Sequence, residues 1–303
     1  MNYTTKYGGW KVFFMKISKA FLAYCEEVVI PSNGSINTES SYRSTASNLI
    51  AYFGDIEISS LTIHDVRRWR AHYASFQKPD TIRWRLSCLR SVLKLMRRKG
   101  ESVIDYEDII IPDKEKKLIE FLTPDEVESF VKVVSRRTRG YAEINRKRNI
   151  AITRVLASSG IRISELCALN RDSIKNRQFS TWIKSAKPRT CYIDIKAEQA
   201  VQEYLSMRVD NNPALFITNQ KGCHRITQRA ARLIFETACN NSLDFDRVRP
   251  HTLRHSFATT LLSRDVDLPY IADLMGHQDI NTTREYLHYC NTKLQQIYDA
   301  AML

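Results

Sequence analysis

The sequence lacks any long hydrophobic run. No apolar stretch approaches the roughly 20 residues that a membrane-spanning helix needs, and Lys16 interrupts the short apolar patch near the N-terminus. That patch is too short for the hydrophobic region of a signal peptide. The sequence therefore predicts a soluble, cytoplasmic protein that does not contact a membrane.

Paired cysteines and phosphate-binding loops are also missing. The seven cysteines are scattered and form no C-x-x-C pair, which favours reduced thiols over a disulfide framework or a zinc knuckle. The chain has no glycine-rich phosphate loop and no carboxylate cluster suited to Mg²⁺. We therefore expect no metal and no other cofactor.

Acidic residues are too few to balance the basic ones. Lys and Arg number 46 against 33 Asp and Glu, which gives a formal net charge of +13. Such an excess favours a polyanionic partner, most often nucleic acid. The alternative is a basic protein without such a partner.

The hydrophobic pattern predicts two domains, which 303 residues can supply. After an N-terminal extension (1–14), residues 15–110 show helical periodicity. Residues 111–119 carry a proline and several charges and predict an exposed linker. Residues 120–303 then predict a second domain that ends in a tail helix.

The second domain contains the only β-prone region that we predict. Two runs rich in β-formers flank a basic turn within residues 179–195, as in a hairpin. Its first helix is expected to have Thr123 as N-cap and Pro124 as first residue. The expected fold class is mainly α-helical, with a small β-sheet in the second domain.

One predicted helix, residues 81–100, has seven basic residues and no acidic one. A solvated helix surface normally mixes both signs, so a face of one sign is better explained by contact with a phosphate backbone. The alternative is a basic face that is merely soluble. The candidate DNA-binding residues of this helix are Arg83, Arg85, Arg90, Lys94 and Arg97.

Two short stretches further on place charged or titratable residues at helical spacing. In SSGIRISELCALN (158–170), Glu165 follows Arg162 by three residues and can pair with it, although alone this indicates only a surface ion pair. In PHTLRHSFATTLL (250–262), His251 and Arg254 share a face near a helix N-terminus, where anions bind well.

Zinc binding by His251 and His255 is the alternative for the second stretch. It lacks the glutamate of H-E-x-x-H, and an arginine stands between the two histidines, so we expect no metal there. His255 is instead expected to be a helix-surface or core histidine.

A third stretch, GHQDINTTREYLHY (276–289), combines a histidine with a tyrosine. Gly276 is expected to end one helix, just before His277. A new helix is expected from Thr282, with Glu285 closing a capping box. Tyr286 would then lie in the first turns of that helix and not deep in a core.

Together these stretches resemble the tyrosine site-specific recombinases, which include phage integrases and Xer recombinases. The shared motifs are G-I-R-I-S-E-L at 160–166, H-T-L-R-H-S-F-A-T at 251–259 and G-H-x-x-x-x-T-T-x-x-Y at 276–286. The resemblance covers essentially the whole chain. It implies an N-terminal helical core-binding (SAM-like) domain and a C-terminal α+β catalytic domain.

The resemblance also implies roles for individual residues. The implied catalytic residues are Arg162, Lys184, His251, Arg254, His277 and the nucleophile Tyr286, with Glu165 supporting Arg162. The family's catalytic lysine lies on a β-hairpin in a glycine-rich motif. Here WIKSAKPR keeps the K-x-x-K-x-R spacing without the glycines, so Lys184 is preferred and Lys187 competes with it. Lys187 and Arg189 are otherwise expected to bind DNA.

The activity implied by the resemblance is cutting and rejoining of duplex DNA at a specific core site. It would proceed through a 3′-phosphotyrosine and a Holliday junction, without ATP or metal, in a tetramer of this chain or of this chain and a second recombinase. Integration, excision, inversion and resolution stay open as outcomes. The rivals are a catalytically silent DNA-binding protein of the same fold and a type IB topoisomerase.

Overall fold

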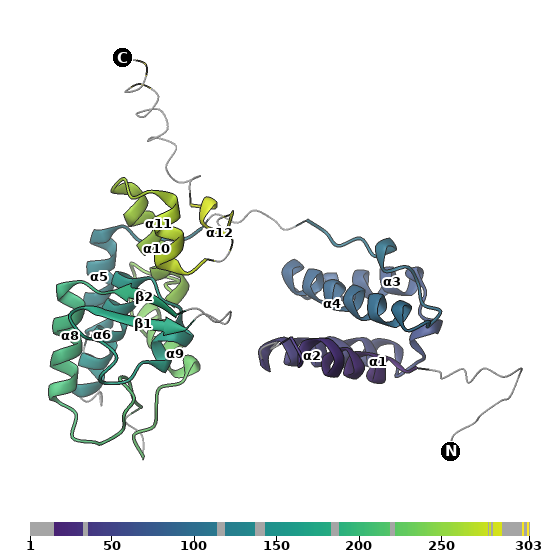
Figure 1. The fold of residues 1–303 in the computed structure, drawn as a ribbon, viewed down its shortest axis with the longest axis horizontal. Coiled ribbons are helices and arrows are strands. Elements are labelled where there is room, and N and C mark those ends of the chain that lie inside the picture. The colour runs from purple at the N-terminus through teal and green to yellow at the C-terminus, as the bar shows by residue number, and fades with distance from the viewer. Residues whose placement is uncertain are drawn as a thin grey trace, which may run out of the picture. The chain divides into compact units, whose positions relative to one another are not determined.

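The chain divides into two compact units, residues 1–116 and 117–303 (Figure 1). The computed structural model describes residues 15–32, 36–113, 119–136, 143–182, 188–218, 222–277, 279, 281–286, 299 and 302. The predicted N-terminal extension, part of the predicted linker and most of the predicted tail helix lie outside these ranges. Within them the fold is helical with one two-stranded sheet, which confirms the predicted fold class. No helix of the described residues is long and apolar enough to cross a membrane.

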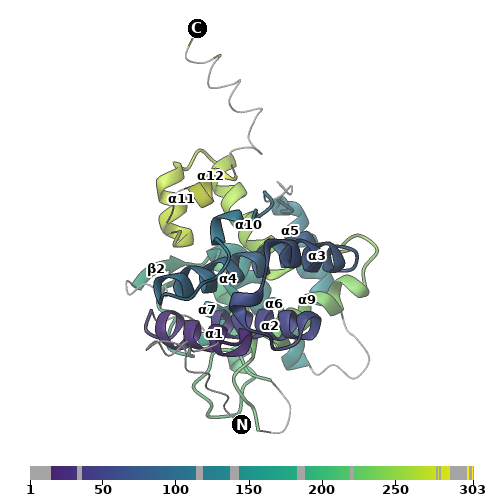
Figure 2. The same cartoon turned by 90° about the vertical axis from the view of Figure 1, so that its right-hand side faces the viewer.

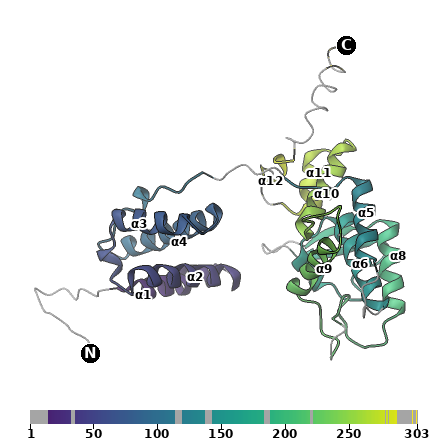
Figure 3. The ribbon, with the colours of Figure 1, turned by 180° about the vertical axis from the view of Figure 1, so that it is seen from behind.

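The first unit is a bundle of helices in which α1 pairs with α2, and α3 with α4 (Figures 1 and 3). Its elements are α1 (Ile17–Tyr24), the π-helical turn η1 (Cys25–Val29), α2 (Ile36–Phe53), η2 (Ile58–Ser60), α3 (Ile63–Ala74), α4 (Pro79–Arg98) and η3 (Tyr106–Asp108). The apolar stripe of α4, from Ile82 to Met96, is buried against α1, α2 and α3. Burying one stripe of a helix removes its apolar surface from water and leaves the charged side chains outside.

The second unit is built around α6. Its helices are α5 (Pro124–Val134), α6 (Glu143–Ser159), α7 (Ile163–Ala168), α8 (Ile195–Ser206), α9 (Gln228–Asn240), α10 (Pro250–Ser263), α11 (Leu268–Met275) and α12 (Asn281–Arg284). Helix α6 packs against α5, α8 and α10, and Ile152, Val155 and Leu156 are fully buried there. Thr123 caps α5 as predicted, because its hydroxyl accepts from the Glu126 amide while Glu126 accepts from the Thr123 amide.

The sheet is a hairpin of β1 (Gln178–Trp182) and β2 (Pro188–Tyr192), in the predicted region. The strands are antiparallel, with Thr181 opposite Arg189. Side chains of β2 alternate between exposed and buried, so Arg189 points to the same buried side as Cys191. Strand β2 packs against α6 and α11. Residues 183–187, which include Lys184 and Lys187, lie outside the described residues.

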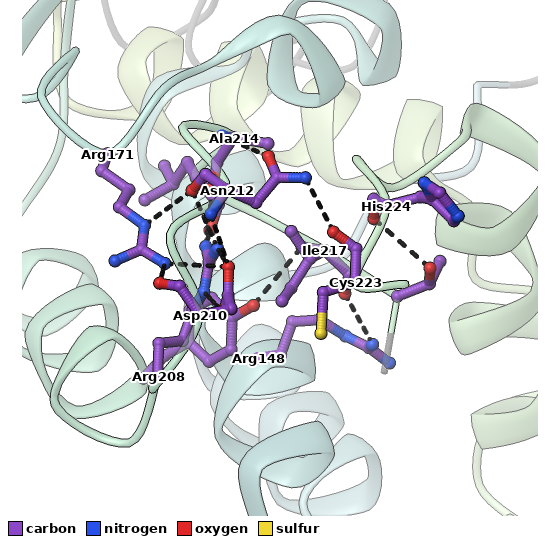
Figure 4. A network of polar contacts seen from close by, with 12 residues as sticks. Arg148, Arg171, Arg208, Asp210, Asn212, Ala214, Ile217, Cys223 and His224 are labelled. Carbon is purple, nitrogen blue, oxygen red and sulfur yellow. Dashed lines mark hydrogen bonds and ion pairs between the residues drawn. The ribbon is translucent and has the colours of Figure 1, made fainter. Parts of the chain in front are cut away.

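A polar network fixes the loop between α8 and α9 (Figure 4). The fully buried guanidinium of Arg208 donates to both carboxylate oxygens of Asp210, over 2.5 and 2.8 Å, and to the carbonyls of residues 214–215. Asp210 also accepts from Arg171 and from the amide of Asn212. These donors lower the pKa of the Asp210 carboxyl, first of all through Arg208.

Helices α10, α11 and α12 lie together at one end of the second unit (Figure 2). The predicted helix from Thr282 is wrong in its bounds, because α12 begins at Asn281 and ends at Arg284, before Glu285. Tyr286 follows in a turn, and only 3% of it is exposed. The expectation that Tyr286 would avoid the core is therefore wrong. Its ring fills a small apolar cluster with Ala258, Leu262, Ile271 and Met275.

Candidate active site

Arg162 and Arg254 are held by a close packing of α6, α7 and α10. Arg162 is the N-cap of α7, two residues after Gly160. Gly160 has φ +61°, and a Cβ at this position would lie 2.3 Å from Cδ1 of Phe257 on α10. Only glycine fits there, for both its backbone conformation and its space. The Gly160 carbonyl in turn accepts a hydrogen bond of 2.6 Å from Arg254.

The C-terminal end of α11 accepts hydrogen bonds from three arginines. Arg189 donates to the carbonyl of residue 274 over 3.0 Å, Arg254 to that of 275 over 2.7 Å, and Arg162 to that of 276 over 3.5 Å. The last carbonyls of a helix have no partner within the helix and lie at the negative end of its dipole. They are therefore suitable acceptors for cations, and they gather three guanidinium groups next to His277.

Glu165 joins two of these arginines. It accepts from the backbone amide of Arg162 over 2.8 Å, from the Arg162 guanidinium over 3.4 Å and from Arg189 over 2.7 Å. Its side chain is 8% exposed, as is that of Arg189, whereas that of Arg162 is 37% exposed. The expected pairing of Arg162 with Glu165 is present, but Arg189 is the closer side-chain partner.

Arg189 does not lie where a DNA-binding residue would. Its guanidinium is buried and donates to Glu165, to the carbonyl of residue 274 and to the Thr181 hydroxyl. This argues against the predicted DNA contact. The prediction took only the spacing along the strand into account, and the pleat of the hairpin turns this side chain inward.

His251 and His277, the two histidines of the implied catalytic set, both interact electrostatically with Arg254 and Arg162. His277 Nδ1 lies 2.7 Å from the hydroxyl of the buried Thr283. Burial, followed by the charges of Arg254 and Arg162, lowers the pKa of His277 to about 4. The same causes lower the pKa of His251, which stands at the exposed start of α10. Both imidazoles are consequently neutral at pH 7 in the free protein.

The hydroxyl of Tyr286 lies 2.7 Å from Nδ1 of His255. Burial raises the pKa of Tyr286 to about 12, and the charge of Arg254 opposes this shift. The prediction that His255 is only a surface or core histidine did not anticipate the contact. The available signal was its place one helical turn after His251, on a helix already carrying a motif.

The basic residues of α4 are partly engaged within their own unit. Arg83 donates to the carbonyl of Pro112, Arg85 donates to Gln77, and Lys94 lies over the ring of Tyr106. Arg97 forms an ion pair with Asp105, and Lys99 forms one with Glu27. The helix has no acidic residue within 81–100, but acidic residues from other segments neutralise part of its charge.

Arg90 differs from these residues. It is half-buried on α4, and no acidic partner for it is found in the described part of the first unit. It is therefore the candidate on this helix whose charge is most available to a phosphate.

Among the described residues of both units, no group of three His, Cys, Asp or Glu side chains is placed to hold a metal ion.

Comparison with known proteins identifies the family. The model of the phage integrase family matches residues 120–292. Tyrosine recombinase XerC of Pseudomonas syringae pv. tomato is 32% identical over 291 residues, covering 92% of this chain and 94% of the relative. XerC of Staphylococcus aureus is 28% identical, covering 80% of this chain and 82% of the relative.

A solved structure has the same fold. The integrase of transposon Tn1549, in complex with a circular intermediate DNA, superposes with a TM-score of 0.74 at 16% identity, covering 93% of this chain and 99% of that one. The sequence motifs, the helical fold with its small sheet and the close relatives agree. This chain belongs to the phage integrase family and is a tyrosine recombinase, an enzyme of site-specific DNA recombination.

Proposed function

We propose that this recombinase binds duplex DNA at a specific core site and cuts it by attack of Tyr286 on a phosphodiester, leaving a 3′-phosphotyrosine. The observation that carries the proposal is the convergence of Arg162, Arg254 and His277 on the end of α11, beside the turn that holds Tyr286. These residues come from three separate stretches of the sequence.

The arginines supply what the reaction needs most. Attack on a phosphodiester builds negative charge on its non-bridging oxygens, and a guanidinium donates to phosphate through a planar fork that stays charged. Arg162 has the more exposed side chain, and Arg254 has N–H groups beyond the two that it uses on backbone carbonyls. His251 and His277 add donors near the same phosphate.

Tyr286 must lose a proton during the attack, and the departing 5′ oxygen must gain one. The phenol of Tyr286 stays neutral at pH 7 in the free protein, because burial raises its pKa to about 12. The cations around the phosphate stabilise the phenolate oxygen as it bonds to phosphorus. Lys184 is our choice as the proton donor to the 5′ oxygen, with Lys187 as its competitor.

Rejoining needs no external energy source. The energy of the broken bond is kept in the phosphotyrosine, which the 5′-hydroxyl of another strand attacks. Four protomers, identical or paired with a second recombinase, would exchange strands through a Holliday junction. Basic residues of α4, above all Arg90, would contact the backbone of the DNA. The DNA complex of the Tn1549 integrase supports DNA as the partner.

The test begins by selecting the bound sequence from random duplexes and locating it by footprinting. A radiolabelled duplex of that sequence, nicked near the protected centre, traps the covalent intermediate. Wild-type protein should form an adduct that survives denaturation, and Tyr286→Phe should bind equally well without forming it. Binding without any wild-type adduct would support the silent DNA-binding protein. Relaxation of plasmids that lack the site would support the topoisomerase.

A further inference from the structure

The contact between His255 and Tyr286 joins the proposed nucleophile to a residue outside the proposed catalytic set. The two residues are 31 positions apart, yet their ring centroids are 5.6 Å apart and the hydroxyl lies 2.7 Å from Nδ1. His255 also lies beside His251, with ring centroids 6.3 Å apart. His255 therefore lies close both to His251, at the exposed start of α10, and to the buried Tyr286.

Tyr286 is the most buried of these three residues. His251 is exposed, whereas Tyr286 is 3% exposed and packs in an apolar cluster. One helical turn, about 5.4 Å, separates His255 from His251 along α10. An attacking oxygen must come within about 3 to 3.5 Å of the phosphorus. A DNA duplex cannot enter the buried cluster that holds Tyr286. The hydroxyl must therefore leave His255 to reach a phosphate bound at Arg162, whose side chain is 37% exposed.

We propose that His255 is a positioning residue that holds Tyr286 in a resting position, and that their hydrogen bond must break before strand cleavage. This inference rests on the proposed role of Tyr286 as the nucleophile. In this proposal His255 controls when Tyr286 becomes available for strand cleavage, and it does not itself contact the phosphate.

The chemistry of the pair suits a reversible hold. Burial, together with His251 and Arg254, keeps the imidazole of His255 neutral by lowering its pKa. In the tautomer with the proton on Nε2, Nδ1 accepts a hydrogen bond from the phenol. No charge has to be separated to break such a bond.

The backbone around Tyr286 allows the movement. Tyr286 follows α12, a helix of only four residues, in a turn. The bond between His277 and Thr283 fixes the other side of this short segment. The phenol can therefore move by adjusting the turn after Arg284, while the three arginines bound at the C-terminal end of α11 keep their places.

Acetylation of tyrosines by N-acetylimidazole, mapped by peptide mass spectrometry, tests the hold without DNA. His255→Leu removes the acceptor at similar volume, and we expect Tyr286 to be acetylated several-fold faster than in the wild type. His255→Asn keeps a polar atom near the place of Nδ1 and should restore protection. His64→Leu, at an exposed histidine of the first unit, is the matched control.

Other tyrosines report on the fold in the same samples. Tyr204 is 0% exposed and should stay unmodified, while Tyr192 and Tyr270, at 53% and 65%, should react in every variant. Unchanged acetylation of Tyr286 in His255→Leu, with Tyr204 protected, overturns the proposal. This outcome does not depend on whether the protein cuts DNA.

The nicked duplex described above tests the consequence for cleavage. The hydrogen bond between His255 and Tyr286 is present only before the reaction, so its loss should speed adduct formation. In a single turnover we expect His255→Leu to form the adduct about 2- to 10-fold faster than the wild type, which is the effect of losing one net hydrogen bond. A slower adduct in His255→Leu overturns the proposal and makes His255 a participant in the reaction. If the wild type forms no adduct, the proposed function fails, and acetylation still decides whether His255 holds the phenol.

Discussion

Arg189 donates to Glu165 over 2.7 Å inside the second unit, and each side chain is only 8% exposed. Because Glu165 also accepts from the amide and the guanidinium of Arg162, this buried pair fixes the more exposed arginine of the site. Arg189 therefore acts on the site from within the protein, through Glu165.

Replacing Arg189 with Met should destabilise the second unit by about 3 kcal/mol, because it leaves the carboxylate of Glu165 buried with a weaker partner. Urea unfolding followed by circular dichroism measures this difference. Arg229→Met, at an exposed arginine of α9, is the matched control and should change stability by less than about 0.5 kcal/mol. Equal midpoints for the two variants would show that the pair does not stabilise the fold.

Asp210 should contribute to stability in a way that depends on pH. Its folded-state pKa is lowered, mainly by Arg208, so the stabilisation is complete above the unfolded pKa of about 3.9 and is lost as pH falls further. Asp210→Asn should cost about 3 kcal/mol at pH 7, and the gap from wild type should shrink in acid. Urea unfolding at several pH values checks this, with Asp246→Asn at an exposed site as control. A gap that stays constant from pH 7 to pH 3 would contradict the assignment.

Gly160→Ala should be far more damaging than another glycine substitution of the same backbone type. Both Gly160 and Gly54 have a positive φ, which costs an alanine about 1 kcal/mol. A Cβ at Gly160 also meets Phe257 at 2.3 Å, whereas nothing lies within 4 Å of one at Gly54. We expect Gly160→Ala to lose at least about 2 kcal/mol and Gly54→Ala about half of that. Adding Phe257→Leu should recover part of the loss if the clash is its cause.

Arg90 and Arg97 should differ in their effect on DNA binding. Arg97 is paired with Asp105, so removing it also releases an acidic group near the DNA. Arg90→Met should reduce the magnitude of the negative slope of log K against log salt concentration by about 0.9, because one fewer counterion is released on binding. Arg97→Met should weaken binding more through the freed carboxylate than through a lost contact, and Arg97→Met with Asp105→Asn should recover affinity. Salt titrations with the selected duplex measure all three, and indistinguishable slopes for wild type and Arg90→Met would remove Arg90 from the interface.

Local signals predicted the parts of the fold that depend on neighbouring residues. The cap at Thr123, the hairpin near 179–195 and the end of α11 at Gly276 are all present. Tyr286 was misplaced, because a capping pattern describes four residues and says nothing of the apolar cluster that α10 and α11 provide. The burial of a large aromatic side chain outweighs the preference of one cap.

Contacts between distant segments could not be predicted from spacing. Asp105 and Glu27 neutralise basic residues near the end of α4 from outside that helix. His255 meets Tyr286 across 31 residues. Arg189 could have been placed inward from the alternation with Cys191 on β2, but its partners Glu165 and the end of α11 lie in other elements.

The three carbonyls at residues 274–276 make the site dependent on the folding of several segments of the second unit. Each accepts from a different segment: β2, α10, and the turn between α6 and α7. No fragment that lacks one of these segments holds all three arginines in place. The site proposed for DNA cleavage is therefore complete only when these segments have folded together, and a nascent or damaged chain carries Tyr286 without the three arginines held in place.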